Sequence, residues 1–333
     1  MDEGTAQRFA LATYRDIDGE HVALVLDQGM VEINQAIDYY WRVCDPEIAA
    51  YAGLGSMMEV LEKWDAHLPL LKLVVTFLAG PQYDAGFLAP DEAYLLAPVP
   101  WPGKMINVGV NFYDHAAEMG MTIPDEGFVP NFFFKGDRNC IIGPSQTIRL
   151  SSSDYVDWEA EMAVVIGSTA RNVKAEQAMA YVAGYTCHND VTDRRLMMKP
   201  NGGLDFFAGK ARDTFAPLGP YLVPREFVPD PRNLGIRCYV NGHVMQHTST
   251  GYMIWGPEQC IEYLSSIVTL RPGDVIALGT GAGVGWSKGI EGEPKSIERM
   301  VAHMESGGGV FLRSGDRVAI EVDGVGRLEN LVE

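Results

Sequence analysis

The first part of the chain is patterned as strands and then as helices. Residues 9–33 alternate apolar and polar positions around turn signals at Asp18-Gly19 and Gln28-Gly29. A two-residue period interrupted by such turns is typical of β-hairpins. It predicts three short strands, over residues 8–16, 21–26 and 30–33.

Residues 34–78 change to a helical spacing of apolar positions. Met57, Val60, Leu61 and Trp64 lie on one face of a helix drawn through them. Prolines then interrupt the pattern within residues 97–103. We therefore predict a small α+β domain over residues 1–100, followed by a second domain over residues 104–333.

The second domain is patterned mainly as short strands separated by Gly, Pro, Asn and Asp. Helical spacing interrupts them near Tyr113 and over residues 175–181, 256–267 and 294–304. Strand-rich sequence with isolated helices indicates an α+β, mainly β fold rather than a doubly wound parallel sheet. The clearest strands are 163–166, 236–240, 275–278 and 318–322.

Charge and cysteine content narrow the class of protein. The formal net charge is −18, which disfavours binding to nucleic acid or to an anionic membrane surface. Five scattered cysteines contain no CxxC pair. The longest apolar run, residues 68–80, contains Lys72 and is too short to span a bilayer. With an acidic N-terminal sequence, these features predict a cytoplasmic protein.

The strongest chemical signal is a pair of glutamates at the start of an apolar strand. Glu159 and Glu161 precede a run of five apolar residues, 162–166. Alternate residues of a strand share a face, so the two side chains lie about 7 Å apart along the chain. Either both carboxylates are solvated at the strand end, or they are buried and need a compensating cation.

A third carboxylate favours the cation. Asp190 ends another strand-like run, residues 181–190. Three carboxylates form a hard oxygen site that suits Mg²⁺ or Mn²⁺ better than zinc, and Ca²⁺ is an alternative. Lys210 is a candidate to neutralise the remaining charge, and its simpler interpretation is a surface lysine.

A short predicted helix carries a candidate base. Asp114 is expected to start this helix, which places His115 and Glu118 on one face. A carboxylate beside an imidazole fixes the tautomer that a general base acting on water requires. The alternative is an ordinary His–Glu contact on a surface helix.

Two other patterns carry less weight. The glycines of residues 279–285 lack the following helix that dinucleotide binding requires, and a loop whose backbone approaches the metal site is the better interpretation. His243 and His247 follow the turn signal Asn241-Gly242, which predicts a hairpin rather than a zinc-binding helix.

Together these segments resemble the fumarylacetoacetate hydrolase superfamily over residues 104–332. Each motif is loose, but all occur in the expected order, whereas residues 1–100 carry no comparable signature. The motifs are Met105–Asn111 with His115-Ala-Ala-Glu118, Glu159-x-Glu161, Val182–Asp190, Gly209–Pro220, Val240–Gln246, Pro272–Ile276 with Gly279-Thr280, and Gly315-Asp316 with Val322–Gly326.

The resemblance implies a mixed β-sandwich roll, a homodimer, and one divalent metal ion. Glu159, Glu161 and Asp190 match the metal carboxylates. His115 and Glu118 match a water-activating pair on a mobile lid, and Lys210 matches the active-site lysine. Thr214 and Thr280 match residues that line the site. Met197 stands where members that cleave acylpyruvates carry a glutamine, and residues 286–314 are longer than the family's pattern.

The expected reaction is metal-assisted cleavage of a C–C bond in a small 1,3-dioxo or 2-oxo acid. His115 and Glu118 would activate water, and the metal would stabilise the enolate. The enzymatic alternatives are decarboxylation of an oxaloacetate-like acid and dehydration or hydrolysis of a 2-keto-3-deoxy sugar acid. The non-enzymatic alternative is a binding protein in which the metal is purely structural.

Overall fold

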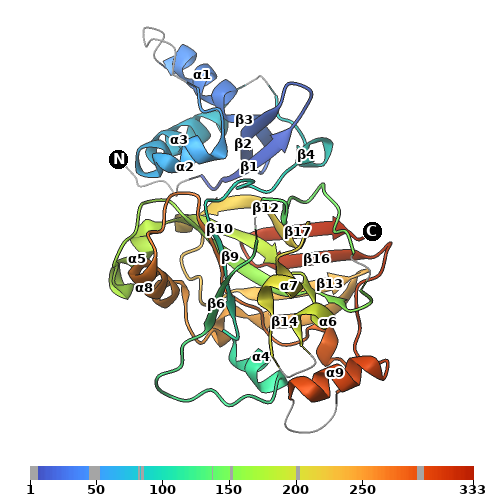
Figure 1. Ribbon diagram of the computed structural model, residues 1–333. Helices are drawn as coiled ribbons and strands as arrows, with labels where there is room; N and C mark the ends of the chain where they lie inside the picture. The colour runs from blue at the N-terminus through green and yellow to red at the C-terminus, as the bar shows by residue number, and fades with distance from the viewer. Residues whose placement is uncertain are drawn as a thin grey trace.

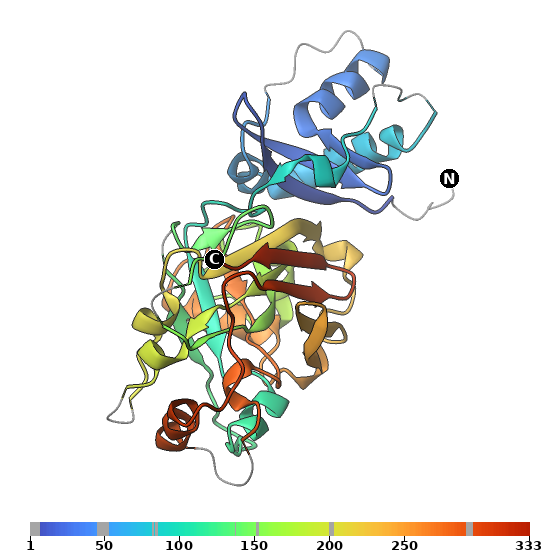
Figure 2. The ribbon, with the colours of Figure 1, turned by 90° about the vertical axis from the view of Figure 1, so that its right-hand side faces the viewer.

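The structure is a computed structural model that describes residues 7–44, 53–81, 83, 86–136, 138–150, 153–199, 203–290 and 296–333. A large mixed sheet runs through the molecule, and a second sheet and short helices surround it (Figures 1 and 2). This arrangement confirms the expected α+β, mainly β fold.

The main sheet has the strand order β3-β2-β1-β12-β10-β9-β15-β5-β6, with β4 paired to β1 and β7 paired to β12. β9 lies between β10 and β15 and is buried along its whole length, as the apolar run predicts. The strands are β1 (Ala10–Arg15), β2 (Glu20–Leu26), β3 (Gly29–Glu32), β4 (Tyr94–Leu95), β5 (Met105–Gly109), β6 (Asn131–Phe134), β7 (Ile141–Ile142), β9 (Ala160–Ile166), β10 (Val182–Asn189), β12 (Ala216–Pro224) and β15 (Val275–Ala277).

A second sheet packs against β9 and β10. Its order is β14-β13-β16-β17, with β13 (Gly235–Val240), β14 (His243–Ser249), β16 (Arg317–Val322) and β17 (Gly326–Leu331). Asn241 and Gly242, both with positive φ, form the tight turn between β13 and β14, so the predicted hairpin is confirmed. The pair β8 (Val156–Asp157) and β11 (Thr192–Asp193) lies beside the start of β9 and the end of β10.

The N-terminal strands and helices form one compact unit. Its helices are α1 (Ile33–Cys44), α2 (Met57–Glu62) and α3 (Trp64–Leu78). Met57, Val60, Leu61 and Trp64 are all buried, as their helical spacing predicts. The Ser56 hydroxyl accepts a hydrogen bond from the Glu59 backbone N–H and so caps the start of α2.

The N-terminal unit shares a sheet and a core with the rest of the chain. β1 pairs with β12, with Leu11 opposite Leu222. Val165 and Val275 of the larger part belong to the same apolar cluster as the α2 and α3 residues. The main sheet and this apolar core therefore contain residues from both sides of the proline segment, where the sequence predicts a domain boundary.

Helices and turns of the larger part lie outside the sheets. α4 and α9 lie at the end of the molecule farthest from the N-terminal unit (Figures 1 and 2). The helices are α4 (Tyr113–Glu118), α5 (Ala175–Ala178), α6 (Arg194–Met197), α7 (Phe206–Lys210), α8 (Pro257–Ile267) and α9 (Ile297–Glu305), with 3₁₀ turns η2 (Met179–Tyr181), η3 (Arg225–Phe227), η4 (Thr250–Tyr252) and η5 (Gly285–Ser287). A further 3₁₀ turn, η1 (Pro90–Glu92), precedes the proline segment.

α4, α5, α8 and α9 match the predicted helical segments, although residues 294–295 of the last prediction lie outside the described residues, whereas α6 and α7 were not predicted. One correction concerns α4. Phe112, and not Asp114, is the N-cap of α4. The Asp114 carboxylate accepts hydrogen bonds from its neighbour's backbone N–H and from the Thr248 hydroxyl instead. In the described part of the chain, no helix combines the length and apolar character needed to cross a bilayer.

Candidate active site

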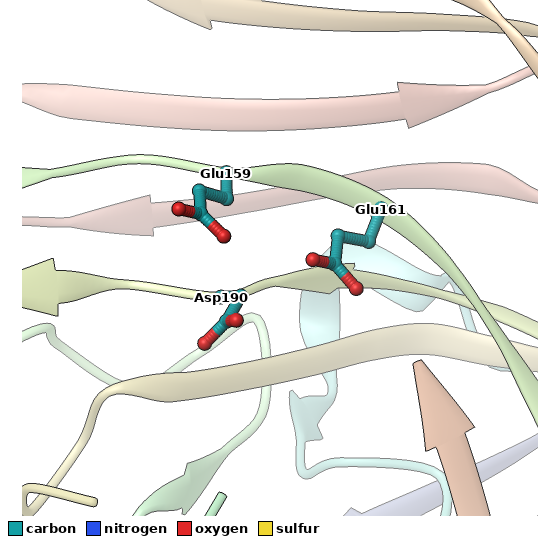
Figure 3. A group of neighbouring side chains, drawn as sticks. All are labelled: Glu159, Glu161 and Asp190. Atoms are coloured by element: carbon teal, nitrogen blue, oxygen red, sulfur yellow. The ribbon is translucent and has the colours of Figure 1, made fainter. Parts of the chain in front are cut away.

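Three carboxylates converge in the middle of the main sheet. Glu159 and Glu161 lie at the start of β9, and Asp190 directly follows β10, which is antiparallel to β9 (Figure 3). One ligand oxygen from each residue lies within 4.8 Å of the others. Their exposed fractions are 7%, 1% and 1%, so the solvated alternative is wrong. Alternation along β9 and pairing with β10 together bring the three groups to one place.

Lys210 binds two of the three carboxylates. Its Nζ donates to Glu159 Oε2 at 2.8 Å and to Asp190 Oδ2 at 2.7 Å. The third donor of the ammonium binds Thr192 Oγ1 at 2.9 Å. Lys210 is 3% exposed, so it is not a surface lysine. Its position at the end of α7 fixes a positive charge beside the carboxylates.

Lys135 is a second buried cation that sequence reasoning missed. It follows the aromatic strand β6 and is fully buried, with Nζ bonded to Asp190 Oδ1 and, at 2.7 Å, to the Val191 carbonyl. Burial lowers the pKa of Lys135, and the adjacent Asp190 carboxylate opposes this shift. A lysine directly after a strand of three phenylalanines is the sequence signal that points to it.

Arg194 and Asp157 form a further buried pair that the sequence did not reveal. Arg194 Nε binds Asp157 Oδ2 at 2.8 Å, and its terminal nitrogen lies 2.7 Å from Glu159 Oε1. Burial raises the pKa of Asp157, although Arg194 opposes the rise. Arg194 and Lys210 therefore contact different oxygens of the Glu159 carboxylate.

Glu161 has no basic ion-pair partner among the described residues. Its Oε2 accepts one hydrogen bond, from the Gly279 backbone N–H at 3.0 Å. Burial, followed by repulsion from Asp190 and Glu159, raises its pKa well above the ordinary value. A buried carboxylate in this position needs either a proton or a cation.

The donor set and the local charge both fit a divalent cation. Oxygen-only ligands at this spacing suit a hard ion. Four buried carboxylates face three buried basic side chains, which leaves one net negative charge when all are ionised. A divalent ion would reverse this to one positive charge, which a monoanionic ligand would balance. The groups counted are Glu159, Glu161, Asp190 and Asp157 against Lys135, Lys210 and Arg194.

The glycine-rich loop donates backbone N–H groups to three carboxylates. Gly279 binds Glu161, Gly283 binds Glu118 at 2.9 Å, and Gly285 binds Asp157 at 2.6 Å. A Cβ on Gly279 would lie 2.8 Å from the Val108 carbonyl oxygen, and Gly279 has φ +89°. The glycines therefore let the backbone approach the site closely.

His115 and Glu118 form a buried pair on α4. His115 Nδ1 lies 2.9 Å from Glu118 Oε2, while Glu118 Oε1 accepts bonds from Gly283 and the Ser287 hydroxyl. Burial tends to raise the pKa of Glu118, but His115, Ser287 and Gly283 together lower it below the ordinary value. A carboxylate that accepts the Nδ1 proton leaves Nε2 as the proton-accepting nitrogen.

A cavity of about 230 Å³ is lined by His115 of this pair and by Glu159 of the three carboxylates. His115, Glu159, Lys210, Arg194 and Thr280 line one part of it, and apolar side chains that include Met197 line the rest. The Thr280 hydroxyl donates to the Ala160 carbonyl at 3.0 Å and accepts from Gln246 Nε2 at 2.9 Å.

Thr214 does not line this cavity. It borders a different one, together with Trp101 and Arg138. The chain turns after α7, and the Thr214 hydroxyl accepts a hydrogen bond from the Arg149 backbone N–H at 2.9 Å. The predicted contact between Thr214 and substrate is therefore not supported by its position.

Comparison with curated proteins shows strong similarity over most of the chain. An oxaloacetate tautomerase of Xenopus laevis is 42% identical over 246 residues, which cover 74% of this chain and 70% of that protein. An oxaloacetate tautomerase of Bos taurus is 38% identical over 278 residues, covering 83% and 79%. Both are named as mitochondrial proteins. A Burkholderia lata protein named as a putative hydrolase is 40% identical over 240 residues, covering 72% and 77%.

Solved structures match the whole fold. A fumarylacetoacetate hydrolase of Exiguobacterium antarcticum has TM-score 0.72 and 27% identity, covering 98% of this chain and 99% of its own. A maleylpyruvate hydrolase of Sphingobium sp. SYK-6, described in complex with manganese(II) and pyruvate, has TM-score 0.68 and 25% identity, covering 96% and 98%. The family described as fumarylacetoacetate (FAA) hydrolase C-terminal matches residues 104–333. The chain is therefore a member of the fumarylacetoacetate hydrolase family, whose enzymes depend on a metal ion.

Proposed function

We propose that this protein is a divalent-metal-dependent enzyme that interconverts the keto and enol forms of small 2-oxo acids. The observation that carries the proposal is that His115, which is hydrogen-bonded to Glu118, lines the same cavity as Glu159. The similarity to proteins named oxaloacetate tautomerases supports the reaction type. Mg²⁺ and Mn²⁺ are the proposed ions, and the manganese complex of the Sphingobium neighbour favours the second.

His115 carries the proton in this reaction. Its Nε2 accepts the proton from C3 of the 2-oxo acid, and the C–H electron pair moves to form the C2–C3 double bond of the enolate. Transfer of the proton held by His115 to the C2 oxygen completes the enol and regenerates the neutral imidazole, so the step is an isomerisation with no net gain or loss of atoms. Glu118 holds the imidazole in the required tautomer and stabilises its protonated form.

We define the charged end of the cavity as the part lined by Glu159, Lys210 and Arg194, together with the adjacent carboxylates. This end binds the acid head of the substrate. Glu159, Glu161 and Asp190 are the residues that would hold the cation, and a bound divalent ion supplies Lewis-acid stabilisation of negative charge on the carbonyl oxygen. Lys210 and Arg194 keep positive charge beside the same place, where an oxo-acid anion is attracted.

The test follows enol absorbance as oxaloacetate equilibrates with Mn²⁺-loaded protein. His115→Ala is expected to slow the catalysed rate by about 10²–10⁴-fold, because the proton acceptor is removed. His247→Ala is the matched control, since His247 is exposed on β14. A chelator should abolish the rate, and added Mn²⁺ or Mg²⁺ should restore it. Full activity in His115→Ala or in chelator would disprove the proposal.

Hydrolysis of a C–C bond in a 2,4-dioxo acid is the second candidate. The apolar part of the cavity favours it, because such acids carry an acyl group that an apolar wall can bind. The His115–Glu118 pair would then activate water. Release of pyruvate from acetylpyruvate indicates hydrolysis, release of CO₂ from oxaloacetate indicates decarboxylation, and enol–keto exchange without either product indicates tautomerisation.

The remaining expectations are tested separately. A purely structural metal predicts binding of Mn²⁺ without any of these reactions. The homodimer is checked by light scattering. The cytoplasmic location stays a prediction, and the animal relatives are named as mitochondrial.

A further inference from the structure

The active-site cavity has an apolar wall that the proposed reaction does not use. We define the apolar wall as Met119, Met197, Met198, Trp286 and Met300, which line the cavity and pack together in one cluster. The last four are at most 6% exposed. Proton transfer at His115 does not require these side chains. We therefore expect them to contact the part of the substrate beyond the acid head.

The basic side chains that line the cavity lie beside the carboxylates at its charged end. All three donors of Lys210 bind Glu159, Asp190 and Thr192. Arg194 pairs with Asp157 and Glu159. Among the described residues that line the cavity, the only other group that can be cationic is His115, whose role is proton transfer.

Within the described part of the chain, a second carboxylate on the substrate would therefore meet the apolar wall without a counter-ion. Moving an ionised carboxylate from water to an apolar surface is strongly unfavourable unless it is paired. An uncharged alkyl, acyl or aryl group gains from the same burial. Methionine side chains are flexible and polarisable, so they can pack around groups of different shape.

The cavity also limits the size of this group. Its volume of about 230 Å³ includes the space for the acid head, and lies below the roughly 300–1,000 Å³ of pockets for drug-sized ligands. Met121 and Leu204, each 43% exposed, lie at the outer side of the lining. The group is therefore short, with its far end directed toward these two residues.

We infer that the preferred substrates are monoanionic 2-oxo acids with a short, uncharged apolar substituent, and that Met197 and Met300 determine this preference over dicarboxylates. The inference rests on the proposed function for the binding of the acid head. Oxaloacetate remains a substrate in this scheme, at lower efficiency.

Inert analogues test the inference by binding alone. N-alkyl oxamates carry adjacent carboxylate and carbonyl oxygens but no C3 hydrogen, so they cannot enolise. Calorimetric titration of Mn²⁺-loaded protein is expected to show about fourfold tighter binding for each added methylene, until the cavity is filled. N-oxalylglycine has the same head with a distal carboxylate, and it should bind at least tenfold more weakly than N-propyl oxamate.

A charge introduced on the wall should reverse this order. Met300→Arg places a cation on the cavity side of α9 and should make N-oxalylglycine bind more tightly than N-propyl oxamate. Ala302→Arg adds the same charge on an exposed position of α9 and should leave the order unchanged. If Met300→Arg does not fold, Met197→Gln provides the second test, because an amide should reduce the gain per methylene.

The outcomes separate this inference from the proposed function. An alkyl series with no dependence on length, or wild-type protein that prefers N-oxalylglycine, overturns the inference while leaving the proposed chemistry intact. No binding of any oxamate to the Mn²⁺-loaded protein overturns both. Tighter binding with length together with no enol–keto exchange and no product release overturns the proposed function alone.

Discussion

The charged end of the cavity and the apolar wall are built from different structural elements. The carboxylates at the charged end come from β9 and β10, in the middle of the main sheet. The apolar wall comes from short elements: Met119 follows α4, Met197 ends α6, Trp286 lies in η5 and Met300 in α9. Central strands open only with large parts of the fold, whereas short surface elements open locally. The comparison indicates that the chemistry is fixed by the sheet and that substrate choice can vary without disturbing it.

The largest expected effect is at the charged end. Lys135→Met should lower the free energy of unfolding of the metal-free protein by about 3–5 kcal/mol, because it leaves Asp190 with one fewer buried partner. Denaturant titration in chelator measures this. Lys174→Met removes the exposed pair with Glu262 and should have little effect. Equal effects of the two substitutions would mean that the charged end is not the tightly held region.

A substitution in the apolar wall should change stability without changing metal binding. Met198→Ala is expected to cost about 2–5 kcal/mol, as for other buried methionines replaced by alanine. Its Kd for Mn²⁺, measured by calorimetry, should equal that of the wild type. Met121→Ala, at a half-exposed position, is the control for stability. A large loss of Mn²⁺ affinity in Met198→Ala would contradict the independence of the two regions.

Metal binding should stabilise the charged end through Glu161. At a free Mn²⁺ concentration about 100 times the Kd, the free energy of unfolding of the wild type should rise by about 2.7 kcal/mol. Glu161→Gln should gain much less, because one of the three ligands is lost. Without metal, this variant should be at least as stable as the wild type, since a buried carboxylate without a cation is replaced by a neutral amide. Glu329→Gln, on β17, should respond to Mn²⁺ like the wild type.

The smallest effect concerns the hydrogen bonds of Glu118, between the two regions. The pKa of Glu118 is lowered in the folded protein. Its contribution to the free energy of unfolding is therefore fully present at pH values above the ordinary pKa of 4.5, and it is lost as the pH falls through the lowered pKa. The free energy of unfolding of the wild type should exceed that of Glu118→Gln by about 1.5 kcal/mol near pH 7. This difference should shrink toward about pH 3. Denaturant titrations at both pH values measure it. A difference that grows on acidification would reverse the assigned direction.

Sequence patterns were sufficient where a local period carries the information. The alternation at Glu159 and Glu161 predicted a shared face, and the apolar run after them predicted the buried strand β9. The helical face from Met57 to Trp64 was equally clear. Asp190, His115 and Lys210 were candidates from their own segments, and the resemblance to a family then assigned them to one site.

The missed residues depend on contacts that no local period records. Lys135 reaches Asp190 across 55 positions of the chain, and Arg194 reaches Asp157 across 37. Thr214 was placed at the site by its motif, but the chain direction after α7 takes it to another cavity. The domain boundary was predicted from prolines, which restrict the backbone locally. They carry no information about the pairing of β1 with β12.

That pairing makes the N-terminal unit a cover for the rest of the molecule. Deleting it would leave backbone groups of β12 unpaired beside Leu222, and would uncover other side chains of the shared apolar cluster, such as Val165 of β9. Exposed strands of this kind recruit strands from other molecules. A shortened chain that keeps every active-site residue should therefore aggregate, and attempts to trim the enzyme to its catalytic segment need a substitute for this missing neighbour.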